Sequence, residues 1–401
     1  MLNFGTLDAY IAGVALKLIS QVECEETHSN QHELNGVKEM RKLFGTTKKI
    51  YPTRFIRLED DEEKSGESYG EMTWYDAREA HPTRTEYRFY YQKNVAIERA
   101  SPEDVLGIIL KKDGHVLFVT APKGSQAEAE LFELFGSALG ASFSVVDFEE
   151  KGTTLTLARR MILEALGIES VAQDAKDYLG FIEKKLGSLS FPNTKTFSRL
   201  AREAFGDTEG LCADERLIYW WNTEEIMFKQ LENVEIENRL RKGFCDADDF
   251  LSFSQFVRQR RSSRAGSALE NHLGEIFETE GVMHSRGKRT EGYKKPDFIF
   301  PSIEKYHEAG FPVERLAMLG VKTTCKDRWR QVLAEADKIP LKHLFTLQPK
   351  ISNNQLDEMF AAHLCLVIPL ALQESYCDTV KRKMWSLEDF LRHVKQLQHA
   401  C

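Results

Sequence analysis

Short apolar runs alternate with charged and turn-forming residues over residues 1–155. These runs are rich in β-branched and aromatic side chains, which favour strands because they pack well on a pleated surface. The acidic stretch 59–71 cannot bury itself, so it predicts a solvated loop. We expect strands at residues 50–58, 73–77, 86–91 and 115–120.

Helical spacing first occurs at residues 125–139, whose apolar positions share one face. It returns in two further stretches, residues 155–166 and 172–186. The Ser-, Pro- and Thr-rich segment 187–196 predicts a connection. We therefore predict a β-rich domain at residues 1–160 and a helical linker at residues 161–205.

Helical and strand patterns alternate over residues 206–401. Alternation with short apolar strands favours a mixed α/β sheet that carries helices on its faces. Ser386 is the expected N-cap of a terminal helix. Helices are expected at residues 214–242, 267–280, 328–338 and 386–398, and strands at residues 298–300, 317–322, 343–346 and 365–368.

The composition is that of a globular protein, with 42% hydrophobic and 29% charged residues. The 54 Lys and Arg residues against 62 Asp and Glu residues give a net charge of −8, which excludes a uniformly basic surface. There is no apolar run long enough to span a bilayer, and the seven scattered cysteines form no CxxC pair. We expect a soluble protein of a reducing cytoplasm, without a secretory signal or a membrane partner.

The residues with the clearest chemical meaning are Asp297, Lys322 and Glu335, with Glu270 upstream. Carboxylates can hold Mg²⁺ against a phosphate, and a lysine can offset the charge that develops on its oxygens. The order resembles the PD-(D/E)xK nuclease pattern, except that the position of the usual acid is Gly320. Glu335, on the expected helix 328–338, could replace that acid. Spacing alone leaves the alternative open that Asp297 is an ordinary residue after a proline and Lys322 a solvated strand end.

Basic residues cluster in three places around these carboxylates, and such clusters suit contacts with phosphates and guanine edges. The alternative is that each cluster is a solvated helix face. The clusters are Arg258, Arg260, Arg261 and Arg264; Arg286, Lys288, Arg289, Lys294 and Lys295; and Lys322, Lys326, Arg328 and Arg330.

From about residue 214 to the C-terminus, the sequence closely resembles the catalytic domain of the EcoRII restriction endonuclease family. The resemblance lies in RRSSRAGSALENHLGEIF, KKPDFIFPS, YHEAGFP and MLGVKTTCKDRWRQVLAEADKI. More weakly, QHELNGVKEMRKLFG and WYDAREAHPTRTEYRFYY resemble the family's effector domain, a DNA-binding pseudobarrel like the plant B-three domains.

The resemblance implies a type II site-specific deoxyribonuclease that acts on double-stranded DNA as a Mg²⁺-dependent homodimer. An N-terminal pseudobarrel would be joined to a C-terminal PD-(D/E)xK α/β domain. The N-terminal domain would bind a second copy of the target and relieve autoinhibition. A companion DNA methyltransferase would complete the restriction-modification system.

Residue roles follow from the same resemblance. Asp297 and Glu335 match metal-binding carboxylates, and Lys322 matches the catalytic lysine. Glu270 and Tyr306 match catalytic positions near the scissile phosphate. The expected DNA contacts are Lys326, Arg328, Arg330, Arg264 and Lys294 in the catalytic domain, and His32, Arg84, Glu86 and Arg88 in the effector domain. The family's arginine-rich stretch at the start of the catalytic domain is replaced here by the residues YWWN at 219–222.

Three other functions remain open from the sequence. The first is a modification-dependent nuclease, whose N-terminal domain would read a methylated base. The second is a DNA-binding regulator with a vestigial site, although Asp297, Lys322, Glu335 and Glu270 are all present. The third is a repair nuclease that cuts DNA structures instead of sequences.

Overall fold

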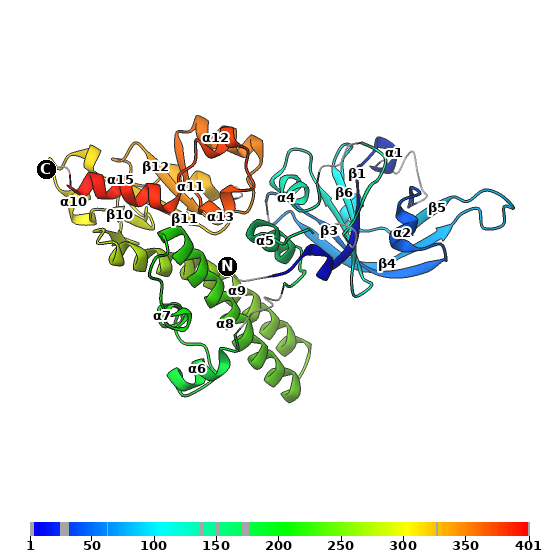
Figure 1. Ribbon diagram of the computed structural model, residues 1–401, viewed down its shortest axis with the longest axis horizontal. Helices are drawn as coiled ribbons and strands as arrows, with labels where there is room; N and C mark the ends of the chain where they lie inside the picture. The colour runs from blue at the N-terminus through cyan, green and yellow to red at the C-terminus, as the bar shows by residue number, and fades with distance from the viewer. Residues whose placement is uncertain are drawn as a thin grey trace. The chain divides into compact units, whose positions relative to one another are not determined.

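The computed structural model describes residues 4–24, 32–61, 63–136, 140–148, 153–170, 176–325 and 328–399. The chain forms two compact units (Figure 1), one of Asn3–Gln173 with Pro349–Glu358 and the other mainly of Asp174–Gln348 and Met359–Cys401. Within the described ranges, no helix combines the length and the apolar character needed to cross a membrane.

The N-terminal unit is built on one eight-stranded sheet of order β2-β5-β4-β3-β7-β6-β1-β8. Neighbouring strands are antiparallel except β3 and β7, which are parallel. The strands are β1 (Ile11–Leu18), β2 (Glu33–Asn35), β3 (Lys49–Arg57), β4 (Gly66–Asp76), β5 (Tyr87–Tyr91), β6 (Val105–Lys111), β7 (Val116–Ala121) and β8 (Ser144–Asp147).

Aromatic side chains fill the core of this unit, where the Phe89 ring lies 4.7 Å from the Trp74 ring and 4.8 Å from the Phe44 ring. The four predicted strands are confirmed, because their branched and aromatic residues line this core. The unit's helices are α1 (Gln21–Cys24), α2 (Met40–Phe44), α3 (Val95–Glu98), α4 (Gln126–Phe135) and α5 (Leu157–Ala165), with a 3₁₀ turn η1 at Leu7–Ala9.

The predicted acidic loop at residues 59–71 is wrong in its second half, because β4 begins at Gly66. Backbone pairing with β3 needs no apolar side chains, and Glu67 and Glu71 lie among the outward positions of β4. Glu67 also accepts a 3.0 Å hydrogen bond from Arg54 Nε on β3. A cross-strand charge pair therefore supports a strand that hydrophobic periodicity does not reveal.

The C-terminal unit carries a mixed five-stranded sheet of order β13-β12-β11-β10-β9, as the sequence predicted for this part of the chain. Strands β11, β12 and β13 are parallel, whereas β10 is antiparallel to both β11 and β9. The strands are β9 (Ser285–Arg286), β10 (Phe298–Phe300), β11 (Ala317–Lys322), β12 (Lys342–Thr346) and β13 (Leu364–Val367).

Helices α9 and α15 cover one face of this sheet. The ring of Phe277 on α9 lies 5.1 Å from the rings of both Phe298 and Phe300, and the ring of Phe390 on α15 lies 5.4 Å from that of Phe300. The unit's helices are α6 (Leu179–Leu186), α7 (Thr194–Phe205), α8 (Ala213–Lys242), α9 (Ala247–Thr279), α10 (Ile303–His307), α11 (Trp329–Leu333), α13 (Leu370–Gln373), α14 (Asp378–Lys381) and α15 (Leu387–His399), with a 3₁₀ turn η2 at Val313–Arg315. Helix α12 (Asn353–Ala361) begins in the stretch Pro349–Glu358, which belongs to the N-terminal unit.

Two predicted helix boundaries differ from the structure. Helix α9 begins at Ala247 instead of residue 267, because Asp246 caps it by accepting the Asp249 N–H at 2.8 Å. Helix α11 ends at Leu333, so Glu335 does not lie on a helix as the sequence predicted. The chain turns there, and Ala336 has a positive φ of 49°, which ends helical geometry.

Ser386 is confirmed as the N-cap of α15. Its Oγ accepts the Asp389 N–H at 3.1 Å, and Asp389 Oδ2 accepts the Ser386 N–H at 3.0 Å. We expect Ser386→Ala to lower the free energy of unfolding of the C-terminal unit by about 1 kcal/mol. Chemical denaturation followed by circular dichroism measures this loss. Ser262→Ala, at an exposed position within α9, serves as the control and should leave stability nearly unchanged.

Candidate functional site

Asp297 and Lys322 meet because β10 and β11 are antiparallel neighbours. Phe298 of β10 pairs with Leu319 of β11, so these two residues share one face of the sheet. Because side chains alternate along a strand, Asp297, Gly320 and Lys322 lie on the other face. Asp297 Oδ2 accepts a 2.6 Å hydrogen bond from the Val321 N–H, which fixes the carboxylate against β11. The two residues that the motif separates in sequence thus share one end of the sheet.

Gly320 explains why the usual acid of the motif is missing. A Cβ atom at this position would lie 2.7 Å from Cγ2 and 2.8 Å from Cγ1 of Val332 on α11. Helix α11 therefore packs so closely on β11 that no side chain fits at Gly320 unless the two elements separate. The chain that leaves α11 instead brings Glu335 close enough for the Asp297 charge to affect its pKa.

Glu335 is electrostatically coupled to both Asp297 and Lys322. Burial, and then the Asp297 carboxylate, raise the pKa of Glu335 to about 7, although Lys322 and Lys342 oppose the shift. Burial also raises the pKa of Asp297, against the Val321 N–H and the Lys322 charge. Among the described residues, no side chain or backbone group hydrogen-bonds the buried Glu335 Oε2. A cation would relieve the unfavourable burial of these two carboxylates.

Two carboxylates with one unpartnered buried oxygen fit Mg²⁺, which keeps several water ligands and needs only one or two protein carboxylates. In the described part of the chain, no three His, Cys, Asp or Glu side chains lie close enough together to hold a metal. If Asp297 and Glu335 held the ion, water and substrate oxygens would fill its other positions.

The charge of Glu270 contributes to the raised pKa of Asp297, and Glu270 itself is held by Arg286. Its Oε2 accepts hydrogen bonds from Arg286 Nε at 3.1 Å and Nη2 at 2.9 Å. Arg286 Nη1 also donates to Asn271 Oδ1 at 2.7 Å, which ties β9 to α9. The sequence placed Arg286 only in a basic patch, and its role in holding Glu270 depends on tertiary contacts.

Tyr306 and Lys294 both bind to the turn that follows α11. Among the described residues, neither forms a hydrogen bond or ion pair with Asp297 or Lys322. The buried Tyr306 hydroxyl donates to Glu291 and accepts the Lys338 N–H at 3.2 Å. Lys294 Nζ pairs with Asp337 Oδ1 at 2.7 Å. Both residues were expected near the scissile phosphate or DNA.

The basic residues predicted to contact DNA have differing environments. Arg264 is buried, with its guanidinium 4.5 Å from the Phe228 ring centroid. Arg328 and Arg330 are exposed, and the Arg330 guanidinium lies 4.8 Å from the Trp329 ring. Lys326 lies outside the described residues. Within the first cluster, Arg260 pairs with Glu235 and Arg261 pairs with Glu232 across α8 and α9, so part of that charge is neutralised.

The expected DNA-contacting residues of the N-terminal unit lie on and beside β5. Arg84 is exposed in the connection between β4 and β5. Arg88 bonds to Glu86 and, through Nη1 at 2.7 Å, to Glu33. These paired charges hold the β5 end of the connection in place.

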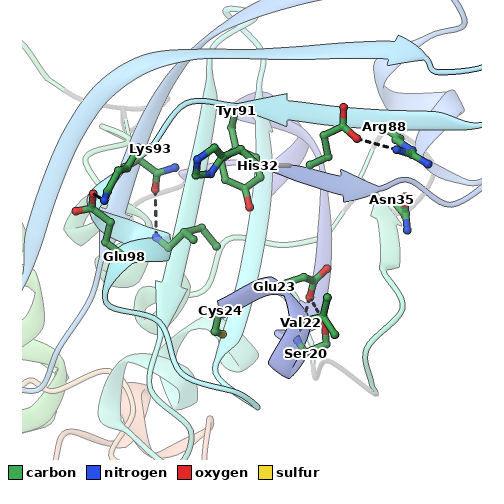
Figure 2. A pocket seen from close by; sticks show the side chains of 13 residues that line it. Ser20, Val22, Glu23, Cys24, His32, Asn35, Arg88, Tyr91, Lys93 and Glu98 are labelled. Carbon is green, nitrogen blue, oxygen red and sulfur yellow. Dashed lines mark hydrogen bonds and ion pairs between the residues drawn. The ribbon is translucent and has the colours of Figure 1, made fainter. Parts of the chain in front are cut away.

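His32 and Arg88 both line a cavity of about 640 Å³ in this unit. Figure 2 shows His32 next to Tyr91, and the ring centroids are 5.9 Å apart. Glu23 and Ser20 lie on another side of the cavity, joined by a 2.8 Å hydrogen bond. The remaining lining residues are Val22, Cys24, Glu33, Asn35, Lys93, Asn94, Ile97 and Glu98.

Comparison with known proteins gives two sequence matches. Residues 228–391 match the family described as EcoRII C terminal. The chain is also 44% identical over 185 residues to the type II restriction enzyme EcoRII of Escherichia coli, a match that covers 46% of each protein. The resemblance predicted for the C-terminal part is confirmed, and the chain spans about half the length of the curated relative that it matches.

Solved structures give weaker matches. Metal-depleted Ecl18kI in complex with uncleaved, modified DNA has a TM-score of 0.44 and 18% identity, over 55% of this chain and 83% of that chain. The restriction endonuclease PspGI-substrate DNA complex has a TM-score of 0.44 and 16% identity, over 52% and 93%. At TM-scores below 0.5, these likenesses carry no further conclusion about the chain.

Proposed function

We propose that the chain is a site-specific type II endonuclease that hydrolyses double-stranded DNA with Mg²⁺. The observation that carries this proposal is the coupling of Asp297, Glu335 and Lys322 within the segment that matches the EcoRII C-terminal family. Two carboxylates and a lysine at one point are the groups that metal-dependent phosphodiester hydrolysis requires.

Asp297 and Glu335 would hold Mg²⁺, and the ion would polarise the scissile phosphate and acidify the attacking water. Lys322, whose charge opposes the pKa rise of both carboxylates, would orient that water and offset charge on the phosphate oxygens. Glu270, fixed by Arg286, adds a third carboxylate near Asp297. Arg328 and Lys326, from the segment after β11, would read bases in the major groove.

For the N-terminal unit, we propose a DNA-binding pseudobarrel that acts as an allosteric effector. Its one large sheet and the exposed Arg84 are compatible with that role. The proposed domains remain residues 1–160 for the effector, 161–205 for the linker and 206–401 for cleavage. His32, Glu86 and Arg88 would complete the effector's DNA contacts.

We further propose a homodimer, because each chain offers one hydrolytic site and a duplex has two strands to cut. A two-fold dimer would match the two-fold symmetry of a palindromic target. A companion methyltransferase would protect the host's own copies of that target.

Sequencing of the ends released from methylated and unmethylated genomic DNA, with and without Mg²⁺, tests the function. We expect Mg²⁺-dependent breaks at one short sequence in unmethylated DNA. Breaks confined to methylated DNA would instead indicate a modification-dependent nuclease, and cuts at branched structures would indicate a repair nuclease. The complete absence of cleavage at all Mg²⁺ concentrations would favour a regulator with a vestigial site.

Arg84→Ala should weaken DNA binding by the effector by about 1.4 kcal/mol, or roughly tenfold, since one exposed arginine contact to a base or phosphate is lost. Fluorescence anisotropy with labelled duplex, measured over a range of salt concentrations in EDTA, gives the affinity and its salt slope. Arg99→Ala is the control, because the Arg99 side chain already donates to the Lys64 carbonyl at 2.8 Å. Equal losses in both variants would count against a specific contact by Arg84.

A further inference from the structure

The turn that carries Glu335 is held by the side chain of Lys342, a short way further along the chain, and by side chains from elsewhere in the C-terminal unit. Within the turn, Glu335 and Ala336 offer backbone carbonyls, whereas Asp337 and Lys338 offer N–H groups. A carboxylate on a turn has more conformational freedom than one on a strand. The contacts that fix this turn therefore decide whether Glu335 is in place for a metal.

Lys342, the first residue of β12, makes the contacts nearest to Glu335. Its Nζ donates to the Glu335 carbonyl at 2.5 Å and to the Ala336 carbonyl at 2.6 Å. The Lys342 side chain is buried, with 8% of its surface exposed, and burial lowers its pKa. A buried ammonium group is costly unless it is bonded, so the two carbonyls and the ammonium group stabilise each other.

The other half of the turn is held from the segment before β10 and from α10. Glu291 accepts the Asp337 N–H at 3.2 Å and also accepts the Tyr306 hydroxyl hydrogen bond. Lys338 Nζ donates to the Tyr306 carbonyl at 2.7 Å. Lys342 therefore holds the first half of the turn, and Glu291 and Tyr306 hold the second half. Ala336, which has a positive φ, lies between them.

We propose that Lys342 is a positioning residue for the metal site, which acts by fixing the backbone of Glu335, and that Glu291 and Tyr306 complete this support. The inference rests on the proposed Mg²⁺-dependent function and deepens it. It gives Tyr306 a positioning role in place of direct contact with the substrate. It also explains how Glu335, which would replace the acid missing at position 320, is held in place on a turn.

Lys342→Met tests the proposal, because methionine keeps the apolar length of the side chain but removes both hydrogen bonds. Mn²⁺ is the probe, since carboxylate and water sites accept it as they do Mg²⁺, and its free form is measured by electron paramagnetic resonance. We expect the full-length variant to bind Mn²⁺ about 10- to 100-fold more weakly, the usual effect of losing a residue that orients a metal ligand. DNA binding in EDTA should be unchanged.

Lys17→Met is the matched control. Lys17 is also a buried lysine, with 5% exposure, and its Nζ bonds to Glu23 in the N-terminal unit. It should lower stability by a comparable amount and leave Mn²⁺ affinity unchanged. If Lys342→Met binds Mn²⁺ as tightly as the wild type, or no more weakly than Lys17→Met, the positioning role is wrong.

Tyr306→Phe covers the case in which Lys342→Met does not fold. It removes one hydroxyl from the far end of the support, so we expect a weaker but measurable loss of Mn²⁺ affinity. Asp297→Ala separates this inference from the proposed function. If Asp297→Ala still binds Mn²⁺ normally, the metal site itself is wrong. If it loses binding while Lys342→Met and Tyr306→Phe keep it, only the positioning role fails.

Discussion

Asp297→Asn is expected to lower the rate of DNA cleavage by about a thousandfold. The substitution keeps the size of the side chain and an oxygen that can accept the Val321 N–H, but it removes one of the two charges available to a metal. Loss of a metal ligand costs several kcal/mol of transition-state stabilisation, and about 4 kcal/mol corresponds to that factor. Single-turnover cleavage of a plasmid that carries the target measures the loss.

The control for Asp297→Asn is Glu308→Gln, which removes an exposed carboxylate that pairs with Lys305 at 2.7 Å. It should cleave at nearly the wild-type rate. Asp297→Asn should also bind target DNA in EDTA at least as well as the wild type, because a negative charge near the phosphate is gone. Cleavage within tenfold of wild type would remove Asp297 from the proposed metal site.

Local patterns predicted the elements that carry the site, but not the contacts between them. The apolar runs at β10 and β11 indicated two strands, and the order of Asp297 and Lys322 indicated that they converge. The position of Glu335 beyond α11 could not be predicted from local patterns, because the helix ends at Leu333 and the chain turns at Ala336. That turn depends on Lys342, which joins the site only in the folded chain.

The basic clusters show the same limit. Arg260 and Arg261 belong to a run that looks like a DNA-binding surface in sequence, yet both pair with carboxylates of α8. The first half of α9 was missed because it is rich in charged and serine residues and lacks a continuous apolar stripe. Its partner Glu232 is buried on α8, and only tertiary packing brings the two helices together. Charge counted along the sequence therefore overstates the charge available to DNA.

Metal binding should strengthen steeply as the pH rises towards 7. A carboxyl must lose its proton to bind a metal, and burial and the Asp297 charge raise the pKa of Glu335 to about 7. At pH 5, Mn²⁺ affinity should be about 100-fold lower than its limit above pH 7, because each pH unit below the pKa costs about a factor of ten. Mn²⁺ titrations from pH 5 to 8 measure this slope, and Glu335→Gln should bind weakly with a flatter pH profile.

The stability of the metal-free protein should change in the opposite direction. Because the folded-state pKa of Glu335 lies above its ordinary value of 4.5, the protonated carboxyl favours folding below pH 4.5, and this contribution is lost as the pH rises through about 7. The loss should be roughly 2 kcal/mol after allowance for partial exposure. Mg²⁺ should restore stability at pH 8, where Glu335 is charged, but not at pH 5. Equal stabilisation by Mg²⁺ at both pH values would mean that the ion binds elsewhere, because only a site that includes Glu335 couples metal binding to this proton.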